Sequence, residues 1–227
     1  MKYSITLILL TLTLFSCKEE AIDSELPLGC VEKFTSSTLD YSAKYVVIPD
    51  PSFEFSLVDQ KLDSDGEVNG KILMADVLKV KELGVNSVSA SKEYIIRDLT
   101  GIEYFKNLEN LTILNCLEDS LDLTHNPKLT GLTFFAFWGG GGSFDRDQAL
   151  KHLKINPSTA LKKLELVMVW MNEIDISGFP NLEEILIGSV PLNTVYVRSK
   201  DQKERLVNTN TVLIGNNQVV RYKICKK

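Results

Sequence analysis

The residues best suited to chemistry are few in this sequence, and their spacing builds no reactive centre. The two histidines, His125 and His152, have no cysteine or acidic residue at a spacing typical of metal ligands. The nucleophile motif G-x-S-x-G is absent, and the carboxylates are scattered along the chain. We therefore expect surface or turn-capping roles for both histidines, and we predict no catalytic residue, no metal and no cofactor.

The acid-rich segment DSDGEVN, which begins at Asp63, is the best candidate for a cation site. It resembles part of an EF-hand calcium loop, in which oxygen ligands fill positions 1, 3, 5 and 12 and glycine stands at position 6. With Gly66 at position 6, Asp63 and Asp65 fall at positions 3 and 5, but Lys61 and Ile72 fall at positions 1 and 12. Because both ends of the ligand set are lost, the segment favours a structural turn over a calcium site.

A hydrophobic leader ends at Cys17. Residues 4–16 carry no charge, follow Lys2 and give way to Lys18-Glu19-Glu20. This run is shorter than the roughly 20 apolar residues that a membrane-spanning helix needs. It therefore predicts a secretory signal peptide over residues 1–16.

The tetrad Leu14-Phe15-Ser16-Cys17 resembles the lipobox of bacterial lipoproteins, in which the cysteine becomes the first mature residue and carries the lipid. The resemblance implies lipid attachment at Cys17. Lys18-Glu19-Glu20 is similar to the tract that, in lipoproteins of Bacteroidetes, accompanies export to the outer face of the outer membrane. We therefore expect a lipid-anchored outer-membrane protein exposed at the cell surface. The alternative is a plain signal peptide followed by a coincidental cysteine.

Charge excludes one class of partner. Removal of residues 1–16 takes away Lys2, one of 25 basic residues, and none of the 30 acidic ones, so the net charge moves from −5 to −6. An acidic surface offers no footprint for nucleic acid and is repelled by anionic lipid headgroups. The lipid, rather than the protein surface, should hold this chain to the membrane, and we expect a monomer.

Three cysteines remain beyond Cys17: Cys30, Cys116 and Cys225. An odd number in an exported chain permits at most one intramolecular disulfide, and no C-x-x-C pair indicates zinc. We expect all three to be free, with Cys116 buried, and the sequence leaves open whether Cys30 and Cys225 pair.

Composition divides the rest of the chain. Residues 17–44 combine the lipidated cysteine with a polar stretch of little apolar periodicity, which indicates a flexible tether. We expect an N-terminal cap over 45–100, with helices near 51–61 and 71–80. Repeats should span 101–198, and a C-terminal cap and tail should span 199–227, with a helix over 200–207.

Two series of apolar residues recur with one period. The first series is spaced by 21, 32 and 21 residues and the second by 32, 21 and 21, so both share one insertion. Chance leucines would not preserve both registers, and the pattern therefore indicates stacked structural units. The first series is Leu108-x-x-Leu111-x-Ile113, Leu129-x-x-Leu132-x-Phe134, Leu161-x-x-Leu164-x-Leu166 and Leu182-x-x-Ile185-x-Ile187; the second is Leu121-x-Leu123, Leu153-x-Ile155, Ile174-x-Ile176 and Val195-x-Val197.

Each L-x-x-L-x-L unit points alternate side chains inward from a short strand, and asparagine-proline corners such as Asn126-Pro127 turn the coil. This skeleton resembles the leucine-rich repeat, and Leu121 to Leu129 is especially close to the form found in Bacteroidetes surface proteins. The resemblance implies an α/β solenoid, a leucine-rich repeat right-handed superhelix of about four regular coils of ~21 residues. The flanking segments resemble the helical N-terminal cap and small C-terminal cap of BspA-like and internalin-like surface lipoproteins. The alternative is a two-layer α+β domain whose leucines fall in register by chance.

The insertion adds 11 residues to one coil and carries aromatic residues beside four consecutive glycines. Insertions in repeats map to loops on one face, often the binding face. Within this Gly-rich insertion at 136–146, Trp138 and Phe144 are candidates to stack on a sugar ring or fill a partner's pocket. An excursion whose aromatics cover the neighbouring coil is an equal alternative.

Strand alternation gives a second candidate surface. If the inward positions are those of the first series, Leu114, Phe135 and Val167 point outward, beside an outward column that includes Thr133 and Glu165. An apolar stripe on an exposed sheet indicates a contact surface. The insertion or Trp170, which we also count among the candidate binding residues, could instead cover it.

Together these patterns predict a non-catalytic, lipid-anchored surface protein whose leucine-rich repeats bind an unknown protein or glycan ligand. The step from repeats to binding rests on family resemblance. The alternative is a scaffold lipoprotein that faces the periplasm or envelope and holds a permanent partner.

Overall fold

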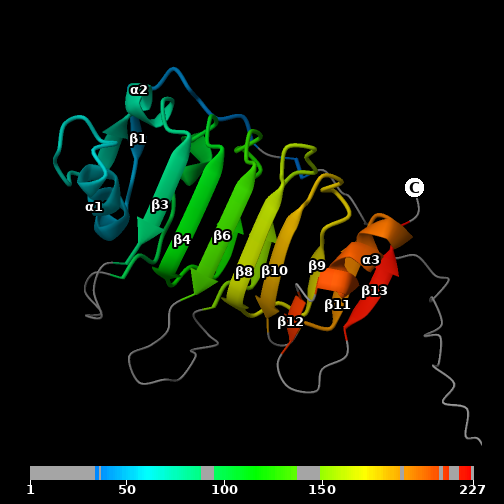
Figure 1. Cartoon of the computed structure of the whole chain (residues 1–227). Helices are drawn as coiled ribbons and strands as arrows, with labels where there is room; N and C mark the ends of the chain where they lie inside the picture. The colour runs from blue at the N-terminus through cyan, green and yellow to red at the C-terminus, as the bar shows by residue number, and fades with distance from the viewer. Residues whose placement is uncertain are drawn as a thin grey trace, which may run out of the picture.

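The chain winds into a solenoid whose strands stack in two rows (Figure 1). This computed structural model describes residues 34–35, 37–87, 95–136, 149–189, 192–209, 212–214 and 220–225. The main sheet has six strands in the order β12-β10-β8-β6-β4-β3, all parallel, which confirms the predicted solenoid. Its strands are β3 (Glu82–Asn86), β4 (Asn110–Cys116), β6 (Gly131–Ala136), β8 (Lys163–Val169), β10 (Glu184–Ser189) and β12 (Val212–Ile214).

The inward leucines explain why these strands stack. Leu111 pairs in register with Leu132, Leu132 with Leu164, and Leu164 with Ile185. All twelve residues of the first apolar series are buried in one continuous core. A single coil of this length cannot bury its own apolar face, so each coil is stabilised by its neighbours.

The second row of strands is interrupted. Within the described residues, β7 pairs with β5 on one side of the interruption, while β9, β11 and β13 form a separate sheet on the other. The second apolar series supplies β5, β7, β9 and β11 as predicted, but Leu153 and Ile155 of the β7 coil are only half-buried. The strands of this row are β5 (Ser120–Asp122), β7 (His152–Lys154), β9 (Glu173–Asp175), β11 (Thr194–Val197) and β13 (Arg221–Ile224).

Amide side chains hold the coil corners together. The buried Asn126 donates from Nδ2 to the carbonyl oxygens of Ile102 and Phe105, at 3.0 and 3.1 Å. Near the C-terminal end of the solenoid, Gln202 makes an equivalent pair of bonds, from Nε2 to the carbonyl oxygens of Ile176 and Phe179. These bonds satisfy carbonyls that the turns would otherwise leave without partners. Single bonds of the same kind run from Asn107 to Leu78, Asn156 to Thr124 and Asn181 to Thr159.

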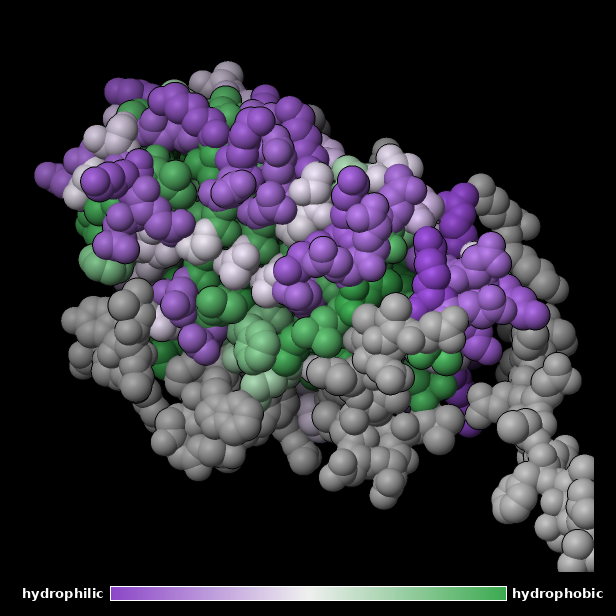
Figure 2. Space-filling view, in the orientation of Figure 1, coloured by the Kyte–Doolittle hydropathy of each residue, from purple (hydrophilic) through white to green (hydrophobic). Residues whose placement is uncertain are grey.

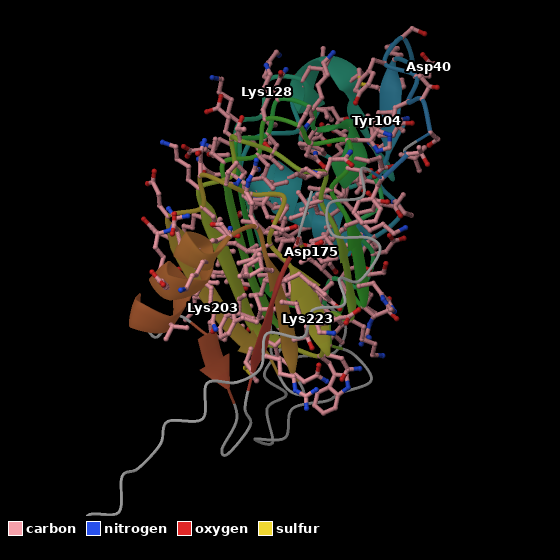
Figure 3. The ribbon with its side chains drawn as sticks, turned by 90° about the vertical axis from the view of Figure 1, so that its right-hand side faces the viewer. Asp40, Tyr104, Lys128, Asp175, Lys203 and Lys223 are labelled. Atoms are coloured by element: carbon pink, nitrogen blue, oxygen red, sulfur yellow. The ribbon has the colours of Figure 1, made fainter. Side chains whose placement is uncertain are left out.

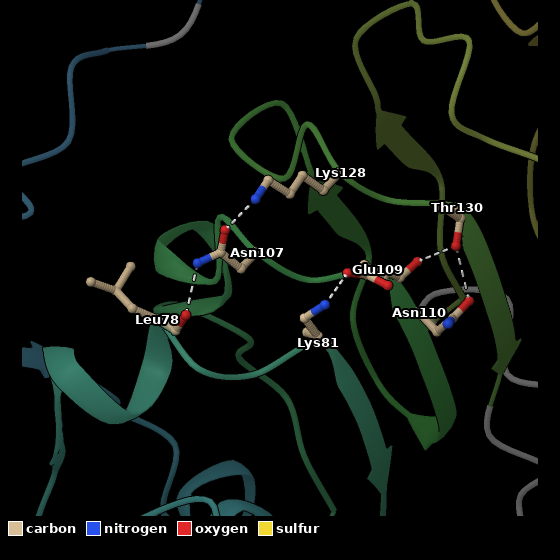
Figure 4. A network of polar contacts seen from close by, with 7 residues as sticks. All are labelled: Leu78, Lys81, Asn107, Glu109, Asn110, Lys128 and Thr130. Atoms are coloured by element: carbon tan, nitrogen blue, oxygen red, sulfur yellow. Dashed lines mark hydrogen bonds and ion pairs between the residues drawn. The ribbon is translucent and has the colours of Figure 1, made fainter.

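Figure 4 shows how the first corner joins the N-terminal cap to the repeats. Lys128 donates from Nζ to Asn107 Oδ1 at 2.7 Å, while Asn107 Nδ2 donates to the Leu78 carbonyl. Lys81 pairs with Glu109 at 2.8 Å, and the Thr130 hydroxyl donates to the Glu109 carbonyl at 2.9 Å. Three successive turns are therefore linked by polar side chains on the outside of the corner.

The N-terminal cap contains the predicted helix, α1 (Pro51–Asp59), and Asp50 caps its first turn by accepting from the amides of Ser52 and Phe53. The second predicted helix, near 71–80, is present but shorter than expected. Strand β2 (Lys71–Leu73) occupies the start of that stretch, and the helix, α2 (Met74–Val77), is a single turn.

Pairing outweighs helical patterning there. Strand β2 lies antiparallel to β1 (Tyr45–Val47), and this pairing buries Ile72 completely. Beyond the cap, a short 3-10 helix, η2 (Ile102–Tyr104), precedes β4. The predicted late helix is present as α3 (Lys200–Thr209).

The end of the expected tether packs against the repeats. We call residues 34–35 and 37–44 the strap. The Ser37 carbonyl lies 2.7 Å from Nε2 of His125, so this histidine contacts the strap. The Tyr41 ring meets the Tyr104 ring edge-on at 5.9 Å. Cross-repeat contacts of this kind have no signature in the polar composition of the segment.

One cysteine prediction is confirmed and one is wrong. Cys116 is free and fully buried in the main sheet, as expected. Cys225, expected to be free, is disulfide-bonded, and its partner lies outside the described residues. Cys17 and Cys30 lie outside them as well.

Candidate binding surface

The outward face of the main sheet carries a continuous apolar row. Leu114 pairs in register with Phe135, Phe135 with Val167, and Val167 with Gly188. Phe135 is 40% exposed, and Leu114 and Val167 are half-buried. Figure 2 shows hydrophobic surface across the middle of this face, bordered on one side by hydrophilic side chains. We call Leu114, Phe135, Val167 and Gly188 the outward row.

Gly188 shapes one end of the outward row. A Cβ at this position would lie 3.5 Å from Cγ1 of Val167. Because glycine has no side chain, the apolar surface of the outward row is lower at Gly188 than at Val167. The β10 backbone is not covered by a side chain of its own at this position.

A second outward column, mostly polar, runs beside the outward row. The Thr133 hydroxyl donates to Glu165 Oε2 at 2.7 Å, and Lys163 Nζ lies 3.1 Å from the same oxygen. Thr112 precedes Thr133 in the column, and Leu186 follows Glu165. Glu165 is thus held in place by two neighbours, which fixes the border of the apolar surface.

The ends of two main-sheet strands contain left-handed residues that the sequence pattern did not reveal. Asn115 has φ 57° and Met168 has φ 58°. The register shifts after Leu114 in β4 and after Gly188 opposite β8. Asn115 and Met168 are the unpaired residues at these shifts, and each turns the end of its strand. As a result, the residues that follow them, Cys116 and Val169, are buried in the core. Asn115 also donates from Nδ2 to Asn86 Oδ1 at 3.1 Å.

Trp170 does not join the outward row. It lies after β8 and lines a cleft of about 860 Å³ between β7 and β9, where the second row is interrupted. His152 and Lys154 lie on the β7 wall, and Glu173 lies on the β9 wall. Trp170 is half-buried there, and its backbone amide donates to the Leu150 carbonyl.

The insertion candidates fall elsewhere. Trp138 and Phe144 lie outside the described residues, as does the predicted lipid attachment site, Cys17. The structure therefore brings together Leu114, Thr133, Phe135, Glu165 and Val167 of the predicted binding residues and separates Trp170 from them.

The acid-rich segment closes on itself. Asp63 is buried and accepts from the Asp65 amide at 3.3 Å, while Asp65 accepts from the Glu67 amide at 2.9 Å and from Asn69 Nδ2 at 3.0 Å. Burial raises the pKa of the Asp63 carboxyl. Within the described ranges, no three His, Cys, Asp or Glu side chains are placed to hold a metal ion.

A buried thiol, Cys116, ends β4, and a half-buried carboxylate, Glu118, lies between β4 and β5. Burial raises the pKa of the Cys116 thiol to about 12, which keeps it protonated and unreactive. Burial, with smaller contributions from the charges of Asp98 and Asp119, raises the pKa of Glu118 to about 7. Glu118 accepts from the Leu99 amide at 3.0 Å.

In the part of the chain that the structure describes, no helix is long and apolar enough to cross a bilayer.

Comparisons with known proteins add little to this geometry. No protein-family model and no curated protein sequence matches the chain. Its path is similar to the functional domain of InlJ from Listeria monocytogenes, which includes a cysteine ladder, with 18% identity and a TM-score of 0.42. The match covers 82% of this chain and 45% of that chain, so this chain spans less than half of the InlJ chain. The evidence for the solenoid is the parallel register of the main-sheet strands.

Proposed function

We propose that this chain is a non-catalytic, lipid-anchored surface protein of the outer membrane, and that the outward row of its repeats binds a protein ligand. The single observation that carries the proposal is the apolar row itself, half-exposed on a sheet held rigid from behind by a packed core. An exposed apolar stripe bordered by polar side chains is typical of a protein interface.

The shape of the surface favours a protein over a glycan. The row presents aliphatic and aromatic carbon, with Phe135 at its centre as an anchor of the kind that dominates binding energy. Sugar recognition would need more hydrogen-bonding groups beside the ring than Leu114 and Val167 provide. The glycan alternative depends on Trp138 and Phe144, which lie outside the described residues.

The anchor part of the proposal is supported by the sequence of residues 1–20 and by Cys225. A disulfide forms and persists in oxidising compartments, which supports export of this chain. The runner-up is a scaffold lipoprotein of the envelope with the same fold and a permanent partner.

Location is tested by protease shaving of intact cells that express the tagged protein, with lysed cells as control. Digestion in intact cells supports surface display. Protection until lysis contradicts it, and would move the envelope scaffold to first place.

Binding is tested with Phe135→Ala in a ligand screen on the surface-displayed protein. The matched control is Phe55→Ala, because Phe55 is also an exposed phenylalanine, at 48%, but lies on α1 of the N-terminal cap. Loss of binding in Phe135→Ala alone supports the proposal. Equal binding by both variants contradicts the role of the outward row.

A further inference from the structure

The strap runs along the solenoid in the direction opposite to the coils. Phe34, at its start, lines the cleft between β7 and β9, while Ser37 meets His125 in the coil of β5. Tyr41 then packs on Tyr104, and Lys106 Nζ lies 4.5 Å from the Tyr41 ring centroid. Phe34 therefore lies against the C-terminal half of the solenoid.

Cys225 lies at that same end. It directly follows β13, its amide donates to the Val197 carbonyl at 2.8 Å, and its side chain is 9% exposed. Figure 3 shows this side of the molecule, with Lys223 on β13 and Lys203 on α3. Lys203 Nζ lies 5.9 Å from the Tyr222 ring centroid, so α3 and β13 form one cap.

The disulfide of Cys225 has two candidate partners. The chain has four cysteines, and Cys116 is free and buried, so the partner is Cys17 or Cys30 unless a second molecule supplies it. Since β13 is two strands from β9, the cleft edge lies about 10 Å from β13 at the usual spacing of strands. The four residue steps from Phe34 back to Cys30 span up to about 14 Å, which is sufficient.

Chain entropy favours the nearer cysteine. Cys30 lies four residues before Phe34, whereas Cys17 lies 17 residues before it. The entropic cost of closing a loop grows as 3/2 RT times the logarithm of its length, so closure through Cys30 is favoured by about ninefold. Lipid attachment at Cys17, which belongs to the proposed function, would remove the other candidate altogether.

We infer that Cys30 is the disulfide partner of Cys225, and that this bond staples the N-terminal segment to the C-terminal cap. The two thiols lose two protons and two electrons to a disulfide-containing oxidant of the exporting compartment, which becomes a dithiol. Two S–H bonds break and one S–S bond forms.

The staple determines the point on the solenoid from which the membrane tether leaves. This consequence rests on the proposed lipid anchor at Cys17. With the bond in place, the free tether is residues 18–29, and the 13 residue steps from Cys17 to Cys30 reach at most about 45 Å. The C-terminal cap is then held within about 45 Å of the bilayer surface.

The test is disulfide mapping of the full-length protein, extracted from membranes in detergent and alkylated in denaturant without reductant. Trypsin should release peptide 19–33 joined to peptide 224–226, and alkylation should be found on Cys116. Alkylated Cys30, or Cys225 joined to a second copy of itself, would overturn the inference.

The same digest separates this result from the proposed function. A lipid-modified peptide 17–18 with an unjoined Cys30 contradicts the staple alone. A Cys30–Cys225 pair without lipid on Cys17 contradicts the anchor alone. A Cys17–Cys225 pair contradicts both.

A pair of variants guards against misfolding. Cys30→Ser should make Cys225 alkylatable while the circular dichroism spectrum stays unchanged. Ser24→Ala, in the same segment, is the matched control and should leave the joined peptides intact. If Cys225 remains inaccessible to alkylation in Cys30→Ser, another partner holds it and the inference is wrong.

Discussion

The two rows of strands derive from one repeat, yet they differ in continuity. Among the described residues, the main sheet runs unbroken through six strands, whereas the second row stops between β7 and β9. The 11-residue excess lies between Leu121 and Leu153, but β5 and β7 pair across it, and the interruption comes where the spacing is regular. Periodicity therefore predicts that a strand forms, and packing decides whether it pairs.

The packing differs at the interruption. Trp170 lies just before β9 and, together with Phe34 of the strap, lines the open cleft between β7 and β9. At the next corner, Pro157 sits so close to Gly178 that a Cβ there would lie 3.1 Å from the proline ring. Strands that are half-buried, as Leu153 is, gain little from pairing and tolerate this separation.

The largest expected effect comes from alternation within the main sheet. Phe134 is fully buried and Phe135 beside it is 40% exposed. Phe134→Ala should lower the free energy of unfolding by about 3–5 kcal/mol through lost burial and a cavity. Phe135→Ala should change it by less than about 1 kcal/mol. Urea denaturation measures both, and comparable losses would contradict the assigned register.

The hydrogen bonds that asparagine side chains donate at the coil corners should give a smaller difference in the free energy of unfolding. Asn126→Ala leaves two carbonyls without their donor, and should lower the free energy of unfolding by about 2–4 kcal/mol. Asn156→Ala, beside the interruption, removes a single bond to Thr124 and should cost about 1 kcal/mol. If the two variants melt alike, the second carbonyl bond of Asn126 contributes nothing measurable to stability.

The smallest expected effect is the pH dependence of stability that arises from Glu118, which lies between β4 and β5. The pKa of Glu118 is raised from 4.5 to about 7 in the fold, so between these values the folded chain binds more protons than the unfolded one. Stability from this group is complete below pH 4.5 and is lost as the pH rises to about 7. Glu118→Gln should therefore raise Tm by about 2–4 °C at pH 8 and leave it unchanged at pH 4.

The control for this pH dependence is Glu82→Gln, an exposed carboxylate on β3. Thermal melts across pH 4 to 8 make the measurement. An identical pH profile for wild type and Glu118→Gln would show that Glu118 does not titrate in this window.

The leucine spacing was sufficient to predict the main sheet, because the buried strands of a repeat place apolar residues such as Leu111 and Leu132 at regularly spaced inward positions. The outward row followed from alternation alone. The left-handed Asn115 and Met168 could not be predicted, since no spacing marks a single extra residue at a strand end. The disulfide of Cys225 and the contact between Ser37 and His125 join segments far apart in the chain, and local patterns carry no such information.

The most direct test of the central claim places a photo-reactive phenylalanine analogue at position 135 and, in a second strain, at position 55, and irradiates intact cells. We predict a discrete protein adduct from position 135 and none from position 55, because only position 135 lies in the outward row. The same adduct from both positions, or one from position 55 alone, would contradict binding through the main sheet.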